Sequence, residues 1–565
     1  MAFNENSRVK IPGLLHFLRI GYIYQSKRNM DIRQHNNIFA DVFKQSIRNI
    51  NGKDYSDECL EEAIKEIEIT TENRKDKGQA FYDRMKAYSD MMLVDFEKPL
   101  RNDFRVVSEL TFKGERDVKF RPDITILVNG IPLGFIEVKK PNNVNGIQAE
   151  FERMKKERLC KDELVPFFNQ LQVLGFTNNQ DYDDEAKTKK QGSYYTTPNG
   201  TSAAYNHFRE EQEIAVSEFI SDEDIDTVLS DNNMMSIKND AEFKQNMKTD
   251  TFANRFITSV FSPERLIFFI RYGIAYVNSP VDGFNKHIIR YPQYFALQAL
   301  LADLKAGVKR GVLWHTQGSG KTAFAYFATN VLRDYYQTKK IITKFYFVVD
   351  RLDLLRQAKM EFEARGMTIA QIESKADFIT NIQSPVVMDG SSQRGAYKET
   401  MNVVNIQKFS DESTVVPDAD TVIQRIYFLD EVHRGYKEKG TFLGNLLGAD
   451  PNGIFIGLTG TPIIDDKPDE NGRKRIKKKF KTTDLFCKYI HKYYYDKSIK
   501  DGYTLKIKKE NIDTKFRTDL RAMLNIKDDE SISVEQWKAA TRTPEYVDQL
   551  CKYIVNDFAI FEDTY

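Results

Sequence analysis

The chain has 565 residues, which at about 100–200 residues per domain predicts three or four domains. Lys and Arg number 83 and Asp and Glu number 82, giving a formal net charge of +1. This balance excludes a globally basic nucleic-acid binder and an acidic disordered chain. The four cysteines lie far apart without a C-x-x-C pair, which argues against disulfides and structural zinc. With no predicted signal peptide or membrane span, a soluble cytoplasmic protein is expected.

The composition and the hydrophobic pattern of the sequence change along the chain. An apolar, alternating block runs from Phe104 to Lys139, and a polar segment from Ser221 to Asp250 is expected to be a linker or a solvated helical insertion. From Ser259 to Ile464, short apolar strands alternate with helical stretches, which predicts a parallel α/β sheet.

Residues 121–141, RPDITILVNGIPLGFIEVKKP, contain two strand-like runs around an Asn-Gly pair and predict a β-hairpin. Asp123 opens the first strand, while Glu137 and Lys139 project from one face of the second. Metal-dependent phosphodiester hydrolysis needs such groups: Asp and Glu to hold Mg²⁺, and Lys to orient or deprotonate water and steady the phosphate. An ordinary charged edge hairpin is the alternative interpretation.

The register of this hairpin tests the nuclease interpretation. A plain two-residue turn at Asn129-Gly130 would place Asp123 opposite Ile136, off the face of Glu137. A three-residue loop or a β-bulge would instead place Asp123 opposite Glu137. We therefore expect the longer loop or a bulge.

A glycine-rich segment, WHTQGSGKTAF, lies between an apolar strand-like run and a helical stretch. Such a turn wraps phosphates with backbone N–H groups at the start of a helix, with Lys321 reaching the β- and γ-phosphates and Thr322 binding Mg²⁺. His315 stands where the usual pattern has its first glycine. The predicted nucleotide-binding residues of this loop are Gly318, Ser319, Gly320, Lys321 and Thr322.

About 110 residues later, RIYFLDEVHRG is an apolar strand that ends in two carboxylates. In an ATPase, Asp430 would hold the Mg²⁺ shell and Glu431 would polarise the attacking water. The two segments together predict a site for ATP and Mg²⁺.

DEVH followed by GLTGTP at Gly457–Pro462 resembles superfamily 2 helicases and translocases. In that family the first motif carries hydrolysis and the second couples it to nucleic acid. RYPQYFAL resembles the adenine-recognition element, with Gln293 as its reader. The resemblance assigns coupling roles to His433, Arg434, Thr459, Gly460 and Thr461.

The upstream hairpin resembles the PD-(D/E)-x-K nuclease fold, and this nuclease joined to a DEVH motor resembles the restriction (R) subunit of type I restriction-modification enzymes. The resemblance implies an α/β multidomain chain: a nuclease domain with linker over 1–250, a first RecA-like ATPase domain over 251–470, and a partial second one over 471–565. It implies double-stranded DNA and the methylase and specificity subunits as partners. Gln148 is assigned nuclease support, although the family's Tyr four residues later is Glu152 here.

After Gly457–Pro462 only about 100 residues remain, too few for a full second motor domain and a docking domain, so an amino-terminal fragment is expected. The basic run Arg473–Lys481 is interpreted as either a solvated loop or a DNA-backbone contact. Two rival functions remain open. One is a DNA-repair or antiphage helicase with a non-catalytic DNA-binding amino-terminal domain, and the other is an ATP-gated scaffold.

Overall fold

The computed structural model describes residues 4–87, 89–141, 146–182, 191–199, 205–280, 282–383, 400–405, 423–432, 446–447, 450–462, 486–504 and 542–564. Contacts divide the chain into two compact units, Met1–Thr504 and Leu505–Tyr565. In the described part of the second unit, residues 544–564 form the helix α20. None of the helices in the described ranges combines the length and apolar character that a membrane crossing requires.

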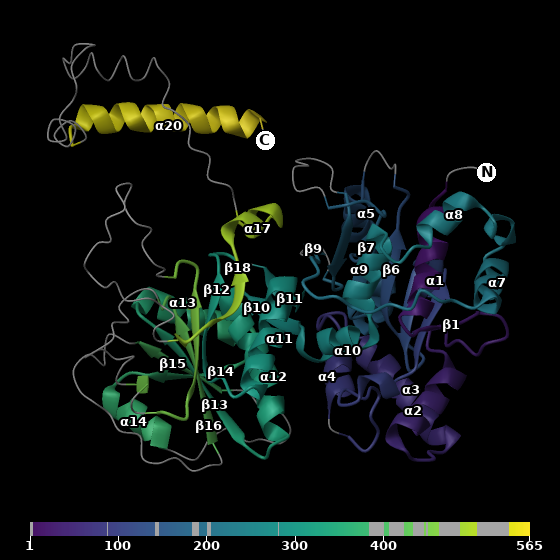
Figure 1. Ribbon diagram of the computed structural model, residues 1–565, viewed down its shortest axis with the longest axis horizontal. Helices are drawn as coiled ribbons and strands as arrows, with labels where there is room; N and C mark the ends of the chain where they lie inside the picture. Colours follow the sequence, from purple (N-terminus) through teal and green to yellow (C-terminus); the bar gives the residue numbers. More distant parts are fainter. Residues whose placement is uncertain are drawn as a thin grey trace. The chain divides into compact units, whose positions relative to one another are not determined.

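Seven strands of the described amino-terminal residues form a mixed sheet in the order β1-β2-β5-β6-β7-β8-β9 (Figure 1). β5 and β6 are the predicted hairpin, and β6 pairs in parallel with β7. The strands are β1 (Ile23–Tyr24), β2 (Phe104–Ser108), β5 (Ile124–Val128), β6 (Ile131–Val138), β7 (Val173–Thr177), β8 (Ser193–Thr196) and β9 (Asn206–His207). A separate small ribbon joins β3 (Phe112–Lys113) to β4 (Lys119–Phe120).

Helices surround this first sheet. They are α1 (Ile11–Arg19), α2 (Ala40–Asn51), α3 (Asp57–Thr71), α4 (Gln79–Lys86), α5 (Gln148–Arg153), α6 (Val165–Gln170), α9 (Phe252–Phe261) and α10 (Pro263–Tyr272). β5 and β6 are buried along their whole length, since the large core packs against one face of this hairpin and two smaller apolar clusters, which include Leu127 and Phe135, pack against the other. The apolar runs ITILV and GFIEV therefore mark central strands rather than an exposed edge hairpin.

The polar segment at 221–250 is helical, as one of the two sequence interpretations expected. It forms α7 (Asp222–Asp231) and α8 (Ala241–Asn246), which the side chains of Ser221 and Asp240 cap. Val228 and Phe243 from these helices are buried in the large core. The segment is therefore packed against the body of the unit and is not a free linker.

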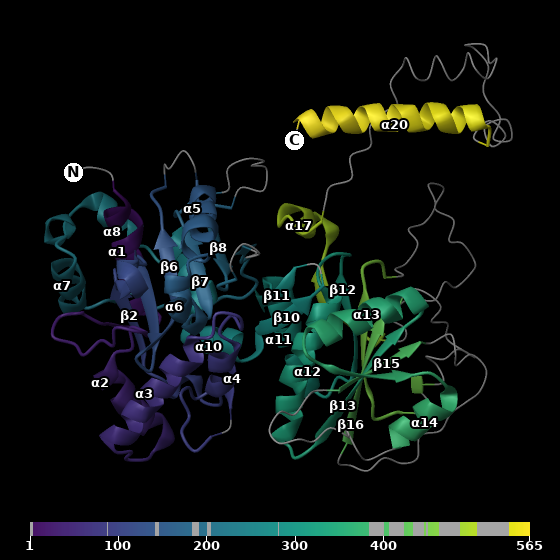
Figure 2. The same ribbon diagram turned by 180° about the vertical axis from the view of Figure 1, so that it is seen from behind.

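A second sheet of seven described strands has the order β14-β15-β13-β16-β17-β12-β18, and every pair in it is parallel (Figure 2). Its strands are β12 (Arg310–His315), β13 (Ile342–Val349), β14 (Thr368–Ile372), β15 (Thr400–Asn405), β16 (Ile423–Asp430), β17 (Ile454–Thr459) and β18 (Tyr489–Tyr493). A hairpin of β10 (Ile274–Ser279) and β11 (Gly283–Ile288) precedes it. The helices are α11 (Tyr291–Lys305), α12 (Lys321–Gln337), α13 (Leu352–Ala364), α14 (Lys375–Gln383) and α17 (Tyr495–Lys500).

Both faces of the second sheet are covered. Along β13, Phe345 and Phe347 belong to the core that includes residues of α11, α12 and α13, whereas Tyr346 and Val348 belong to the core that includes α14. Parallel strands covered on both faces read as continuous apolar runs, which is the pattern that the sequence showed. An α/β multidomain fold is confirmed at this level.

The predicted domain limit at residue 470 divides elements that pack together. β18 pairs in parallel with β12 through Val312–Tyr489 and Leu313–His491, so it extends the second sheet rather than beginning a new one. Sequence spacing could not reveal this, because β18 joins the sheet beside a strand almost 180 residues earlier in the chain.

Candidate functional site

The glycine-rich loop, residues 316–320, connects β12 to α12, as its position between a strand and a helix predicted. We refer to it as the phosphate loop, after its predicted role. Gly318 and Gly320 have φ angles of +82° and +84°, which L side chains rarely adopt. A Cβ on Gly320 would lie 2.5 Å from Nε2 of Gln293. These glycines are therefore required by the backbone and by the close approach of a neighbouring side chain.

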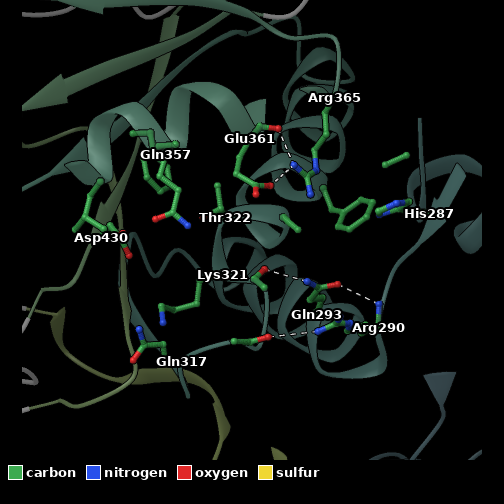
Figure 3. Close-up of a pocket in the computed structure, with 18 of the residues that line it drawn as sticks. His287, Arg290, Gln293, Gln317, Lys321, Thr322, Gln357, Glu361, Arg365 and Asp430 are labelled. Carbon is green, nitrogen blue, oxygen red and sulfur yellow. Dashed lines mark hydrogen bonds and ion pairs between the residues drawn. The ribbon is translucent and has the colours of Figure 1, made fainter. Parts of the chain in front are cut away.

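The loop opens into a cavity of about 430 Å³. Figure 3 shows Lys321 and Thr322 between Asp430 on one side and Gln293 on the other. Of the predicted ATP-site residues, those that line the cavity are Gln293, Gly318, Gly320, Lys321, Thr322, Asp430 and Glu431. Ser319 has a different position: it is buried, and its hydroxyl donates to the carbonyl of Thr316 at 2.7 Å, which closes the loop on itself.

The two carboxylates predicted for hydrolysis lie at the carboxyl end of β16. Glu431 has a φ of +50°, a strained conformation for a residue other than glycine. Its Oε1 lies 3.9 Å from Nζ of Lys321. Burial raises the pKa of Asp430 to about 6, although the charge of Lys321 opposes the shift. The strained backbone of Glu431 and the raised pKa of Asp430 therefore occur side by side, at the position where ATP hydrolysis is predicted.

Gln293 is buried near the start of α11. Its Nε2 donates to the carbonyl of Gly320 at 2.9 Å, and its Oε1 accepts from the backbone N–H of Arg290 at 3.0 Å. Arg290 also donates to the carbonyl of Gly318 at 3.4 Å. The predicted adenine reader therefore contacts the phosphate loop directly, with a basic neighbour that the sequence did not single out.

The predicted coupling segment at the end of β17 also lies against the phosphate loop. Trp314 Nε1 donates to the carbonyl of Gly460 at 3.2 Å, and a Cβ on Gly460 would lie 3.2 Å from the Gln317 nitrogen. Thr461 N–H donates to Oγ1 of Thr459 at 3.1 Å, which forms a turn. His433 and Arg434 lie outside the described residues, as does the basic run at 473–481.

The β5–β6 hairpin has the predicted bulge. Val128 pairs with Ile131 across a two-residue turn, and a register shift between Ile126 and Leu127 then pairs Ile124 with Ile136. The shifted register places Asp123 opposite Glu137, and Asp123 Oδ2 accepts from the N–H of Val138 at 2.9 Å. The bulge alternative is confirmed, while the three-residue loop is not present.

Glu137 and Lys139 lie within a compact group of charges. Burial raises the pKa of Glu137 well above its usual value, and the neighbouring carboxylates Asp123 and Glu150 add to the shift. Glu137 Oε1 is buried without a hydrogen-bond partner among the described residues. Burial alone would lower the pKa of Lys139, but the surrounding carboxylates raise it. The lysine is therefore held as a cation.

Two of these carboxylates were missed from the sequence. Lys139 Nζ lies 3.4 Å from Glu150 Oε2 and 3.8 Å from Glu5 Oε1. Glu150 lies on α5 between the buried side chains of Ile147 and Met154, so a carboxylate on an apolar helix stripe was the available signal. Glu5 lies 134 positions before Lys139, and no feature of the sequence near it indicated this contact.

Gln148, the predicted support residue, begins α5, and its side chain lies outside the described positions. Among the described residues, no group of three or more His, Cys, Asp or Glu side chains is arranged to hold a metal ion. The pair Asp123 and Glu137, with an unpartnered buried oxygen, is the part of the group that fits a divalent cation.

Two family models match the chain. The type I restriction enzyme R protein N terminus matches residues 2–193, and the SWI2/SNF2 ATPase matches residues 292–539. The endonuclease subunit of the type I restriction enzyme HindI from Haemophilus influenzae is 24% identical over 515 residues, covering 83% of this chain and 42% of that protein. The chain belongs to the type I restriction enzyme R-subunit family.

Other relatives extend the match within this family. The endonuclease subunit SauCOLORF180P from Staphylococcus aureus strain COL is 23% identical, covering 94% of this chain and 48% of that protein. The chain thus spans about half the length of the curated relatives it matches. A solved structure of the Type ISP restriction-modification enzyme LlaBIII bound to DNA matches 37% of this chain and 15% of its own at 14% identity, with a TM-score of 0.26.

Proposed function

We propose that this R-subunit chain supplies ATP-dependent DNA cleavage to a type I restriction system. Its amino-terminal sheet would cut phosphodiester bonds with Mg²⁺, and its second sheet would use ATP to translocate double-stranded DNA. The observation that carries the proposal is the charge cluster around Lys139, in the same chain as a phosphate-loop cavity lined by Lys321 and Asp430. Neither chemistry alone accounts for both sites.

For the nuclease, the residues support a site of the PD-(D/E)-x-K type. Asp123 and Glu137 would hold Mg²⁺, which supplies a polarised water and neutralises charge on the attacked phosphate. Lys139 is held protonated by its carboxylate neighbours, so its proposed task is to steady the phosphate rather than to act as a base. Glu150 and Glu5 position the Lys139 ammonium.

For the motor, the cavity geometry supports ATP and Mg²⁺ as ligands. Lys321 would contact the β- and γ-phosphates, while Thr322 and Asp430 would hold the Mg²⁺. Glu431 would orient the attacking water, and Gln293 would read the adenine. Coupling to DNA is assigned to the segment Thr459–Thr461 and, outside the described residues, to His433 and Arg434.

The partners follow from the proposed family role. Methylase and specificity subunits would choose the DNA sequence, and this chain would act on DNA without reading bases. Division of the chain into a nuclease region over 1–250 and a motor region from 251 stays part of the proposal, with β18 added to the motor.

The test separates the two sites by substitution. In the chain assembled with its methylase and specificity subunits, Asp123→Asn should abolish DNA cleavage but leave ATP hydrolysis intact. Glu152→Gln, on the exposed side of α5 with Lys156 as its partner, is the matched control and should cleave like the wild type. Cleavage by Asp123→Asn at the wild-type rate would instead favour a helicase with a non-catalytic amino-terminal domain.

A further inference from the structure

The segment 486–504, which contains β18 and α17, packs against the phosphate loop from outside the cavity. The N–H of Thr316 donates to the carbonyl of Tyr493 at 3.1 Å. Thr504 Oγ1 donates to the carbonyl of Gln317 at 3.1 Å, and a Cβ on Gly318 would lie 3.2 Å from the carbonyl oxygen of Tyr503. This bracing segment therefore contacts three consecutive residues of the loop.

A series of hydrogen-bonded side chains connects this segment to His315, the last residue of β12. His315 Nε2 lies 2.7 Å from His491 Nδ1, and His491 Nε2 lies 2.7 Å from Glu211 Oε2. His315 is fully buried, and Nδ1 on its far side has no hydrogen-bond partner among the described residues. Glu211 comes shortly after β9, the last strand of the amino-terminal sheet.

The protonation states along this chain are linked. Burial raises the pKa of Glu211, but the hydrogen bond and charge of His491 and the charge of Lys497 outweigh it, so the pKa lies below its usual value. Burial lowers the pKa of His315 well below its usual value, with His491 and Lys321 adding to the shift. Glu211 is therefore an ionised acceptor, and His315 is neutral.

The direction of the histidine–histidine hydrogen bond then follows from His491. Because Glu211 accepts from His491 Nε2–H, a neutral His491 must accept at Nδ1 from His315 Nε2–H. A protonated His491 instead donates at Nδ1 and forces His315 into its other tautomer. The carboxylate of Glu211 thus holds a proton on Nε2 of His491 and fixes the orientation of that imidazole, which in turn hydrogen-bonds to His315 at the base of the phosphate loop.

A second anchor holds the same segment. The buried carboxylate of Asp501 accepts from Arg209 Nη2 at 3.0 Å and from the hydroxyl of Tyr493 at 2.7 Å. The hydroxyl of Tyr291, at the start of α11, donates to it as well. Residues 209–211 therefore hold the bracing segment at two points, and that segment holds the loop.

We propose that Glu211, His491 and Asp501 are positioning residues for the nucleotide site, through which the strand end of the amino-terminal sheet sets the geometry of the phosphate loop. This inference rests on the proposed ATP site. It also explains the departure at His315: glycine there could not join the hydrogen-bonded chain.

The test is titration of the chain with a fluorescent ATP analogue in the presence of Mg²⁺. Glu211→Gln keeps the shape of the side chain but removes its charge, and it should weaken nucleotide binding on the order of tenfold, within the range usual for coupled sites. Glu213→Gln, two residues later and exposed, is the control and should bind like the wild type. Lys321→Ala should abolish binding.

Imidazole ¹⁵N resonances supply a readout that a merely structural role would not change. The chain has only 7 histidines, and His491→Asn identifies the relevant signals. In Glu211→Gln, the imidazole of His491 should no longer be restricted to forms that carry a proton on Nε2, because the amide can donate as well as accept. The melting temperature should stay near the wild-type value. Unchanged affinity and tautomers in Glu211→Gln, with binding lost in Lys321→Ala, would overturn the positioning role alone. Wild-type binding by Lys321→Ala would instead overturn the proposed ATP site.

Discussion

Asp430 carries a charge that the folded chain disfavours, so its removal should stabilise the protein while removing its function. Burial raises the pKa of this carboxyl from 3.8 to about 6. Between these values the native state binds more protons than the unfolded state, so the free energy of unfolding falls as the pH rises through that window. Asp430→Asn keeps the shape and a hydrogen-bond acceptor but cannot ionise.

The size of the effect follows from the shift. At about 1.36 kcal/mol for each pKa unit, ionised Asp430 costs up to about 3 kcal/mol at pH 7 and about half as much at pH 5. In a domain of about 150–250 residues, each kcal/mol shifts the melting temperature by about 2–4 °C. Asp430→Asn should therefore melt several degrees above the wild type at pH 7, with a gain at pH 5 that is about half as large.

Thermal melts with EDTA and without nucleotide measure this difference at the two pH values. Glu363→Gln, an exposed substitution on α13, is the control. Its free energy of unfolding should differ from that of the wild type by no more than about 0.5 kcal/mol, so its melting temperature should barely change. If Asp430→Asn melts at or below the wild type at pH 7, or if its gain is equal at both pH values, the reasoning about this carboxylate is wrong.

Three further substitutions test other parts of the structure. Burial lowers the pKa of Lys286 to about 7, so above that pH the unfolded chain binds more protons than the folded one. Lys286→Met should therefore be more stable than the wild type at pH 7. Thermal melts should show this advantage shrinking towards pH 9. Gly320→Ala should lose nucleotide binding in a fluorescence titration, because its Cβ would collide with Gln293 at a positive φ; wild-type affinity would contradict this. Asp450→Asn leaves the buried guanidinium of Arg425, 2.6 Å from the carboxylate, without its counter-charge; calorimetry should show a loss of about 3–5 kcal/mol, and a loss below about 1 kcal/mol would count against the pair.

The sequence predicted features that depend on local spacing. The phosphate loop, the carboxylates at the end of β16 and the bulged hairpin follow from strand periodicity and from the requirement that Asp123 and Glu137 share a face. Their physical basis is short-range, since a period of two fixes which side chains face the same way. The fold class follows for the same reason.

The contacts missed from the sequence come from distant segments that meet only after folding. Glu5 reaches Lys139 from the start of the chain, and His491 reaches His315 because β18 pairs with β12. No pattern in either segment specifies its partner. The unexpected His at the first position of the loop was visible, but its meaning depended on a strand predicted to belong to another domain.

The most direct test of the central claim compares three proteins in one assembly. The subunit, combined with methylase and specificity subunits, is assayed for ATP hydrolysis and for cleavage of DNA carrying the recognition site. The wild type should do both, Lys139→Ala should hydrolyse ATP without cleaving, and Lys321→Ala should do neither. Cleavage by Lys139→Ala at the wild-type rate would contradict the claim that the charge cluster at this hairpin is the nuclease.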